Sequence, residues 1–225
     1  MNLPERKHYT HEEYLEYDTI VLANGAYPQQ SKLRSLLCKA IDSEQHFVAC
    51  CDGAVNNLYL HTQQVPDLVV GDLDSVGPEL RALLGDKLVH ITEQETNDLS
   101  KTIRYIHQTQ GKQRIVLLGA TGKREDHTLG NISLLPSYAP LVEELVLLSD
   151  TGYFRLITSH CSLEVKVGIQ LSFFVFGTEA ISVRGVQWPI EQMSLPYLWS
   201  GTLNRACSER IEIDTTVPIL VFIAN

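Results

Sequence analysis

Carboxylates that can hold a divalent metal ion occur close together after an apolar run of the sequence. The segment 71–75 reads Gly-Asp-Leu-Asp-Ser and directly follows the apolar residues Leu68–Val70. In an extended segment, side chains two positions apart point the same way, and Gly71 lets the backbone approach a ligand closely. Mg²⁺ prefers oxygen ligands and usually binds one or two carboxylates together with substrate phosphates. Asp72 and Asp74 therefore predict a magnesium site, and a plain Asx-type turn is the structural alternative.

A third carboxylate follows further along the chain. Asp98 lies at the start of a helical segment predicted for Asn97–Gln108, with Lys101 three residues later. Asn97 is a suitable N-cap and Asp98 a suitable first-turn acid, so capping by itself explains both residues. The segment also follows a strand predicted for Lys87–Ile91. If that strand lies beside the strand that precedes the first two carboxylates, Asp98 can complete the metal site.

A glycine-containing turn supplies groups that suit phosphate. Residues 119–127 read Gly-Ala-Thr-Gly-Lys-Arg-Glu-Asp-His and follow a predicted strand, Arg114–Leu118. The turn is not a P-loop, which needs four residues between its glycines and Ser or Thr after its Lys. Its free amides and the following helix start still favour an anion, and Arg124 adds a bidentate donor. Asp126 and His127 either cap the helix or position a substrate.

Alternating elements must position these residues. Short apolar runs predict strands at Thr19–Ala23, Phe47–Cys51, Leu68–Val70, Lys87–Ile91, Arg114–Leu118 and Leu145–Leu148. Helical segments begin near Ser31, Val55, Pro78, Asn97 and Asp126. This alternation predicts βα units and a mostly parallel sheet, in which ligands bind beyond the carboxyl ends of the strands. Those ends read Asn24-Gly25, Asp52-Gly53, residues 71–75, residues 119–122 and Ser149-Asp150.

The pattern changes near residue 150. Strand-like segments without helices between them occur at Tyr153–Thr158, Cys161–Lys166, Gln170–Phe176, Ala180–Arg184, Arg210–Asp214 and Pro218–Ile223. Such a series predicts an antiparallel sandwich. We therefore expect a polar N-terminal arm at 1–17, an α/β domain at 18–149 that carries the metal and phosphate site, and an all-β domain at 150–225.

Bulk composition excludes several classes of function. The 225-residue chain has 18 Lys and Arg against 27 Asp and Glu, a formal charge of −9, and this charge disfavours a nucleic-acid partner. Five cysteines show no CxxC pair and predict a reducing compartment. The sequence has no signal-peptide pattern at its start and no apolar stretch near ~20 residues. We expect a cytoplasmic protein without a membrane segment.

Taken together, the motifs resemble the thiamine pyrophosphokinase family. The resemblance rests on their order and spacing over most of the chain. The segments that carry it are Cys51–Asn56, Pro66-Asp67, residues 71–75, Glu95–Asp98 with Lys101, residues 119–127 with Asn131, Trp188 and Ser200–Asn204. It implies a Rossmann-like α/β domain followed by a β-sandwich, and a homodimer whose active site is shared between subunits. It also implies transfer of the ATP diphosphate to the thiamine hydroxyl, by in-line attack on the β-phosphorus with loss of AMP.

The resemblance also implies roles for individual residues. Asp72, Asp74 and Asp98 hold Mg²⁺, and Arg124 and Asp126 join them in catalysis. The residues implied for binding ATP are Asp52, Gly53, Asn56, Gly71, Ser75, Lys101, Gly119, Thr121, Gly122 and His127. Those implied for binding thiamine are Gln94, Trp188, Ser200, Thr202 and Asn204. A cation over the Trp188 indole would gain roughly 0.5–2 kcal/mol. The general base stays open among Asp74, Asp98 and Asp126.

Some residues depart from the family pattern, and other functions remain open. Asn97 stands where the family usually has Thr, and Leu203 precedes Asn204, which weakens the thiamine assignments relative to the metal assignments. A second enzyme class, the aspartyl-phosphate phosphatases, is suggested by Asp72-Leu73-Asp74, although that chemistry wants its Asp after the first core strand. A non-enzymatic alternative is a module that binds a nucleotide or vitamin without turnover.

Overall fold

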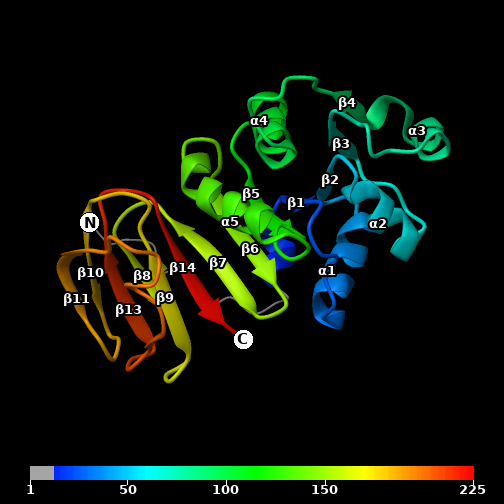
Figure 1. Cartoon of the computed structure of the whole chain (residues 1–225). Helices are drawn as coiled ribbons and strands as arrows, with labels where there is room; N and C mark the ends of the chain where they lie inside the picture. Colours follow the sequence, from blue (N-terminus) through cyan, green and yellow to red (C-terminus); the bar gives the residue numbers. More distant parts are fainter. Residues whose placement is uncertain (1–12) are drawn as a thin grey trace. The chain divides into compact units, whose positions relative to one another are not determined.

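The computed structural model describes residues 13–225 and contains two compact units (Figure 1). One unit holds the described residues up to Leu134 together with Pro140–Asp150, and the other holds Leu135–Ala139 with Thr151–Asn225. The predicted arm falls largely outside the described residues. Within the described part, Tyr14 is buried in a short 3₁₀ helix, η1 (Glu13–Glu16), and Tyr17 is buried directly after it.

The first unit is built on parallel strands. They are β1 (Thr19–Leu22), β2 (Phe47–Cys51), β3 (Leu68–Gly71), β4 (Leu88–His90), β5 (Arg114–Leu118) and β6 (Glu144–Ser149). Their order in the sheet is β6-β5-β1-β2-β3-β4. Every pairing within this order is parallel. The carboxyl ends of the strands therefore lie along one edge, as the alternation of elements predicts.

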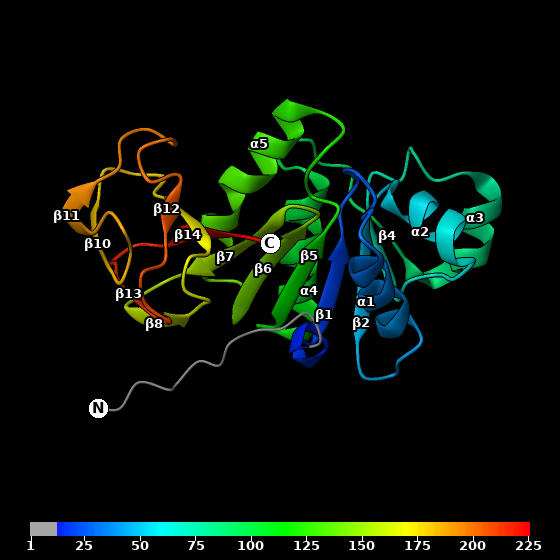
Figure 2. The ribbon, with the colours of Figure 1, turned by 90° about the horizontal axis from the view of Figure 1, so that it is seen from below.

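Five helices connect these strands: α1 (Ser31–Ile41), α2 (Ala54–Thr62), α3 (Pro78–Leu84), α4 (Asp98–Gln110) and α5 (Glu125–Leu134). A 3₁₀ turn, η2 (Gly85–Lys87), precedes β4. Helix α1 buries Leu33, Leu36, Leu37 and Ala40, the spacing of one helical face. Figure 2 shows α1 in front of the strands and α4 behind them. Strand β2, which contacts both helices, is consequently buried along almost its whole length.

The second unit consists of two antiparallel sheets. Its elements are η3 (Leu135–Tyr138), β7 (Gly152–Ile157), β8 (Cys161–Glu164), β9 (Gln170–Phe174), β10 (Ala180–Arg184), β11 (Ile190–Ser194), β12 (Asn204–Arg205), β13 (Arg210–Asp214) and β14 (Ile219–Ala224). One sheet runs β12-β9-β14-β7 and the other β11-β10-β13-β8. A shared core joins their inner faces, with Phe173 and Val221 from one sheet and Val183 and Ile211 from the other.

The predicted fold class, α/β followed by antiparallel β, is confirmed. Two strands were not predicted, and each has a local reason. Strand β11 buries only Ile190 of its five residues, so its sequence shows no alternation. Strand β12 has two residues and turns Asn204 inward. Within residues 13–225, none of the helices combines the length and the hydrophobicity needed to cross a bilayer.

Candidate functional site

The strand ends bring one group of predicted residues together. Asp52 follows β2 and Asp72 follows β3, and these strands pair side by side, with Cys51 opposite Val70. The Asp52 amide donates to the Val70 carbonyl at 2.8 Å, which extends the ladder beyond β2. Gly71, at the end of β3, packs directly under the Asp52 side chain.

Asp52 is a buried carboxylate in an unusual backbone conformation. Its side chain is 4% exposed and its φ is 41°, in the left-handed region that non-glycine residues rarely adopt. Among the described residues, no hydrogen-bond donor reaches its buried Oδ1 atom. A buried acceptor without a partner costs free energy, so the position marks a place where a ligand or cation would be stabilised.

The acidic loop after β3 is a turn. We expected an extended segment with both carboxylates on one side, and this detail is wrong. Leu73 is buried with φ of 64°, and the Asp74 amide donates to Asp72 Oδ1 at 3.2 Å. This is the Asx-type geometry of the structural alternative. The Arg81 side chain donates to the Leu73 and Val76 carbonyls and so holds the loop in place. Asp74 is exposed.

Asp98, which follows β4, lies within electrostatic reach of Asp52 and Asp72. Burial raises the pKa of Asp98, and the negative charges of Asp52 and Asp72 raise it further, although the Lys101 ammonium acts in the opposite direction. Lys101 is 4% exposed, and its Nζ lies 3.5 Å from Asp98 Oδ1. A buried cation thus faces the acidic group. Gln94 Nε2 lies 3.4 Å from Asp72 Oδ2, which places this predicted thiamine ligand at the acidic loop.

These residues do not form a complete metal cage. Among residues 13–225, no set of three or more His, Cys, Asp or Glu side chains is arranged to hold a metal ion. Mg²⁺ seldom requires such a set, because it retains several waters and bonds to substrate phosphates. The unpartnered Asp52 Oδ1 atom and the charge repulsion on Asp98 are features that a divalent cation with bound phosphate would relieve. The donor atoms therefore fit Mg²⁺ carried in with a nucleotide.

The glycine-containing turn after β5 is tied to the loop after β1. The Gly25 amide donates to the Gly119 carbonyl at 2.6 Å and the Ala26 amide to the Thr121 carbonyl at 2.8 Å. Gly119 and Gly122 have φ of 64° and 77°, which explains the choice of glycine there. Lys123 Nζ donates to the Asn24 side chain at 3.1 Å. Sequence reasoning gave no role of their own to Asn24, at a predicted strand end, or to Lys123, in the glycine-containing turn.

Arg124 and Asp126 form a two-pronged ion pair at the start of α5. Arg124 Nε donates to Asp126 Oδ1 at 3.0 Å, and its Nη2 lies 2.5 Å from Oδ2. The guanidinium lowers the pKa of Asp126 to about 2. Both side chains are exposed, so this pair contributes little to folding stability. The pair fixes the direction of the guanidinium with two of its N–H groups and leaves the others for a further acceptor. His127 is exposed beside it.

A side-chain bridge links the start of α4 to the glycine-containing turn. Asn97 caps α4, as predicted, since its Oδ1 accepts from the Ser100 amide at 2.9 Å. The Asn97 Nδ2 donates to Asn131 Oδ1 at 3.0 Å, and Asn131 Nδ2 donates to the Ala120 carbonyl at 2.8 Å. The acid at the start of α4 and the phosphate-type turn are consequently held in one framework.

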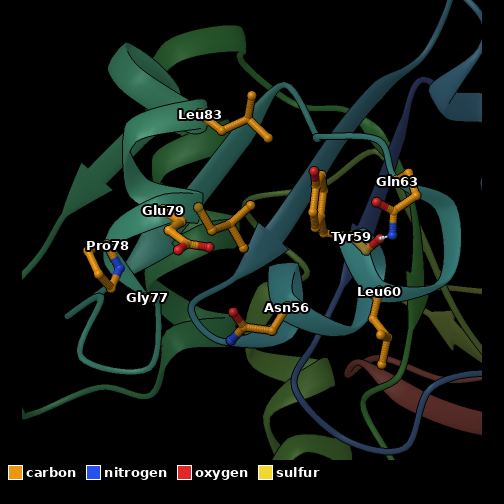
Figure 3. Close-up of a pocket in the computed structure, with 9 residues that line it drawn as sticks. Asn56, Tyr59, Leu60, Gln63, Gly77, Pro78, Glu79 and Leu83 are labelled. Atoms are coloured by element: carbon orange, nitrogen blue, oxygen red, sulfur yellow. Dashed lines mark hydrogen bonds between the residues drawn. The ribbon is translucent and has the colours of Figure 1, made fainter.

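A cavity of about 550 Å³ lies next to the acidic loop, between α2 and α3 (Figure 3). Asn56 and Tyr59 line it from α2, and Pro78 and Leu83 from α3. Asn56 Nδ2 donates to the carbonyls of Gly53 and Ser75 at 3.1 and 2.9 Å. Three residues predicted to bind ATP are therefore joined to one another, and one of them, Asn56, lines this cavity.

The remaining predicted thiamine ligands lie in the second unit. Trp188 is 57% exposed, and the segment 197–203 presents further exposed apolar side chains, with the rings of Tyr197 and Trp199 stacked at 6.2 Å. The Thr202 hydroxyl donates to the Trp199 carbonyl at 2.8 Å, and the Ser200 amide donates to the Tyr197 carbonyl at 2.9 Å. Asn204 differs from these residues because its side chain is buried.

Comparisons with known proteins agree along the chain. A family model described as the thiamin pyrophosphokinase catalytic domain matches residues 38–147, and one described as the thiamin pyrophosphokinase substrate-binding domain matches residues 152–222. Thiamine pyrophosphokinase 1 of Arabidopsis thaliana is 27% identical over 202 residues, which cover 76% of this chain and 75% of that protein. Its counterpart from Oryza sativa subsp. japonica is 27% identical over 178 residues, covering 66% and 67%.

Solved structures share the fold. The thiamin pyrophosphokinase from Candida albicans aligns with a TM-score of 0.75 at 19% identity, over 100% of this chain and 94% of that one. The thiamine pyrophosphokinase from Bacillus subtilis aligns with a TM-score of 0.71 at 20% identity, over 92% of this chain and 99% of that one. At these identities the structures bear on the fold alone.

Proposed function

We propose, because this chain belongs to the thiamin pyrophosphokinase family of enzymes, that its strand-end residues bind ATP with Mg²⁺ for transfer of the diphosphate group to thiamine. Family membership assigns the activity, with ATP as donor and thiamine as acceptor. The single observation that supports the site is the buried Asp52 carboxylate, whose Oδ1 has no hydrogen-bond partner among the described residues and which, like Asp72 and the buried Lys101, acts electrostatically on Asp98.

In this proposal, Asp72, Asp74 and Asp98 hold Mg²⁺, and Asp52 lies behind them as a further carboxylate. When bound, Mg²⁺ supplies positive charge to the phosphate oxygens. Lys101 balances the charge of the acids from inside the protein. The backbone of the turn at 119–122 and Arg124 orient the phosphate chain from the other side, so that the thiamine hydroxyl attacks the β-phosphorus in line and AMP leaves.

The acceptor site is proposed from exposed groups. Trp188 offers an indole face to the cationic thiazolium ring or the flat pyrimidine, and Ser200, Thr202 and Gln94 supply polar contacts. Of the three acids considered as general base, Asp126 suits the role least, because Arg124 lowers its pKa to about 2. The homodimer implied by the resemblance is a further proposal, which light scattering on the purified protein measures directly.

One assay tests the reaction. Purified protein is mixed with ATP, MgCl₂ and thiamine, and the products are separated by chromatography. Equal amounts of AMP and thiamine diphosphate are expected. ADP or free phosphate with a trapped aspartyl-phosphate would instead indicate a phosphatase, and ATP binding without turnover would indicate a binding module. Calorimetric titration of MgATP into Asp72→Asn and Asp52→Asn variants tests the metal assignment independently of turnover, since weaker binding is expected in both.

A further inference from the structure

Asn204, a residue implied by the resemblance to bind thiamine, has a buried side chain. Its side chain is 5% exposed at the start of β12, where it pairs with Leu171 of β9. Its neighbour on the chain, Leu203, is 66% exposed, and Trp188, to which it is hydrogen-bonded, is 57% exposed. A buried amide among exposed neighbours must satisfy its polar atoms within the protein.

The polar atoms of Asn204 are committed to one neighbouring segment. Its Oδ1 accepts from the Trp188 amide at 3.2 Å and from the Arg205 amide at 2.9 Å. Its Nδ2 donates to the Trp188 carbonyl at 2.8 Å. The side chain therefore holds the Trp188 backbone by both its amide and its carbonyl, much as a neighbouring strand would. The carboxamide oxygen has used both lone pairs, and burial shields the remaining N–H from a substrate.

Backbone contacts next to Trp188 show that Asn204 continues the pairing between two segments of the chain. The Gln187 amide donates to the Arg205 carbonyl at 2.8 Å, and Val186 forms an isolated bridge with Ala206. Regular pairing between the two segments stops there, and Asn204 extends it by one residue with its side chain. Only the indole of Trp188 then extends outward. Its direction depends on a backbone that Asn204 fixes.

We propose that Asn204 is a positioning residue that clamps the Trp188 backbone and so presents its indole to thiamine, rather than a residue that contacts thiamine. This inference rests on the proposed role of Trp188 in thiamine binding. A free tryptophan on a mobile segment loses part of its stacking energy to ordering, and a fixed backbone removes that cost before the substrate arrives.

Tryptophan fluorescence tests the clamp without substrate. The chain has two tryptophans, so Trp199→Phe leaves Trp188 as the single reporter. Asn204→Ala in this background should lower the fluorescence anisotropy of Trp188. The matched control is Ser172→Ala. It removes the acceptor of the Leu203 amide, which lies 3.3 Å from the Ser172 hydroxyl, and in the described part of the chain this hydroxyl has no hydrogen bond to Trp188. Its anisotropy should stay at the parent value.

Kinetics then separate positioning from contact. Asn204→Ala should raise the KM for thiamine about tenfold, the equivalent of one lost hydrogen-bond pair, with the KM for ATP unchanged. In the double variant with Trp188→Ala, the KM for thiamine should equal that of Trp188→Ala alone. If the two substitutions multiply each other's effect on the KM for thiamine, Asn204 contacts thiamine directly and the inference is overturned. An unchanged anisotropy in Asn204→Ala, or an equal drop in anisotropy in Ser172→Ala, would also overturn it.

Failure of the thiamine role of Trp188 and failure of the Asn204 clamp give different results. If Trp188→Ala leaves the KM for thiamine unchanged, the proposed thiamine role of Trp188 fails, and the anisotropy still decides whether Asn204 clamps that residue. If Asn204→Ala does not fold, Asn204→Ser replaces it, with the same expected drop in anisotropy.

Discussion

Gly71 packs against Asp52 so closely that a Cβ atom on the glycine would lie 2.6 Å from the Asp52 Cβ and 3.1 Å from its Cα. Real Cβ atoms do not approach other atoms at this distance, so the pair occupies its place only because residue 71 has no side chain. The contact lies between the ends of β2 and β3. It lets the buried carboxylate of Asp52 reach the acidic edge of the sheet.

Substitution of Gly71 tests that relationship. We expect Gly71→Ala to lower the free energy of unfolding by about 1–3 kcal/mol, the usual cost of overpacking, and to weaken MgATP binding by displacing Asp52. Gly77→Ala is the matched control on the same loop, because a Cβ there meets nothing within 4 Å. Urea unfolding and calorimetry measure both quantities. Equal behaviour of the two variants would contradict the packing argument.

The metal assignment predicts a large loss of turnover in Asp72→Asn. Loss of a well-placed electrostatic contact typically costs ~3–4 kcal/mol in barrier, so kcat should fall about a hundredfold or more. The fold should persist, because the Asp72 side chain carries only a turn contact and the Gln94 contact. Steady-state kinetics and circular dichroism provide the measurement, with Asp86→Asn as an exposed control. Near-normal turnover would remove Asp72 from the site.

Asp98 should destabilise the metal-free protein at neutral pH. Its pKa is raised above the ordinary value of 3.8 by burial, so the folded protein binds that proton more tightly than the unfolded chain. Stability from this group is therefore present below pH 3.8 and is lost as the pH rises through the folded-state pKa. The Asp98→Asn variant cannot ionise at this position, so its folding stability should not fall in this way as the pH rises.

Thermal unfolding with EDTA tests this sign. At pH 7 the Tm of Asp98→Asn should exceed that of the wild type, and the difference in Tm should disappear near pH 3.5. In a separate assay with MgCl₂, the variant should lose turnover at every pH. A lower Tm of the variant at pH 7 would show that the attraction between Lys101 and Asp98 outweighs the burial and the repulsion from Asp52 and Asp72.

The bridge from Asn97 to Asn131 predicts energetic coupling. Asn97→Ala should cost about 1 kcal/mol through the lost N-cap of α4, and Asn131→Ala should free the Ala120 carbonyl that it now holds. Because the two side chains touch at 3.0 Å, their effects on unfolding free energy should be non-additive by at least about 0.5 kcal/mol. Denaturant titration of both single variants and the double variant measures the coupling. Strict additivity would mean that the bridge carries no energy.

The elements of this protein follow from local pattern. Phe47–Cys51, Arg114–Leu118 and Ala180–Arg184 are strands with the predicted bounds, because burial imposes a periodicity that neighbouring residues reveal by themselves. The N-cap at Asn97 was also predictable, since capping involves residues three positions apart. Edge strands such as β11 lack this signal, because solvent accepts almost any side chain on them.

Sequence by itself determined which acids stand at strand ends and, through the parallel order of βα units, that those ends share one edge. Tertiary structure decided the rest. The bare carboxylate oxygen of Asp52 and the enclosed amide of Asn204 both depend on residues distant in the chain. A side chain's type gives its chemistry locally, whereas its burial and its hydrogen-bond partners exist only after remote segments have packed around it.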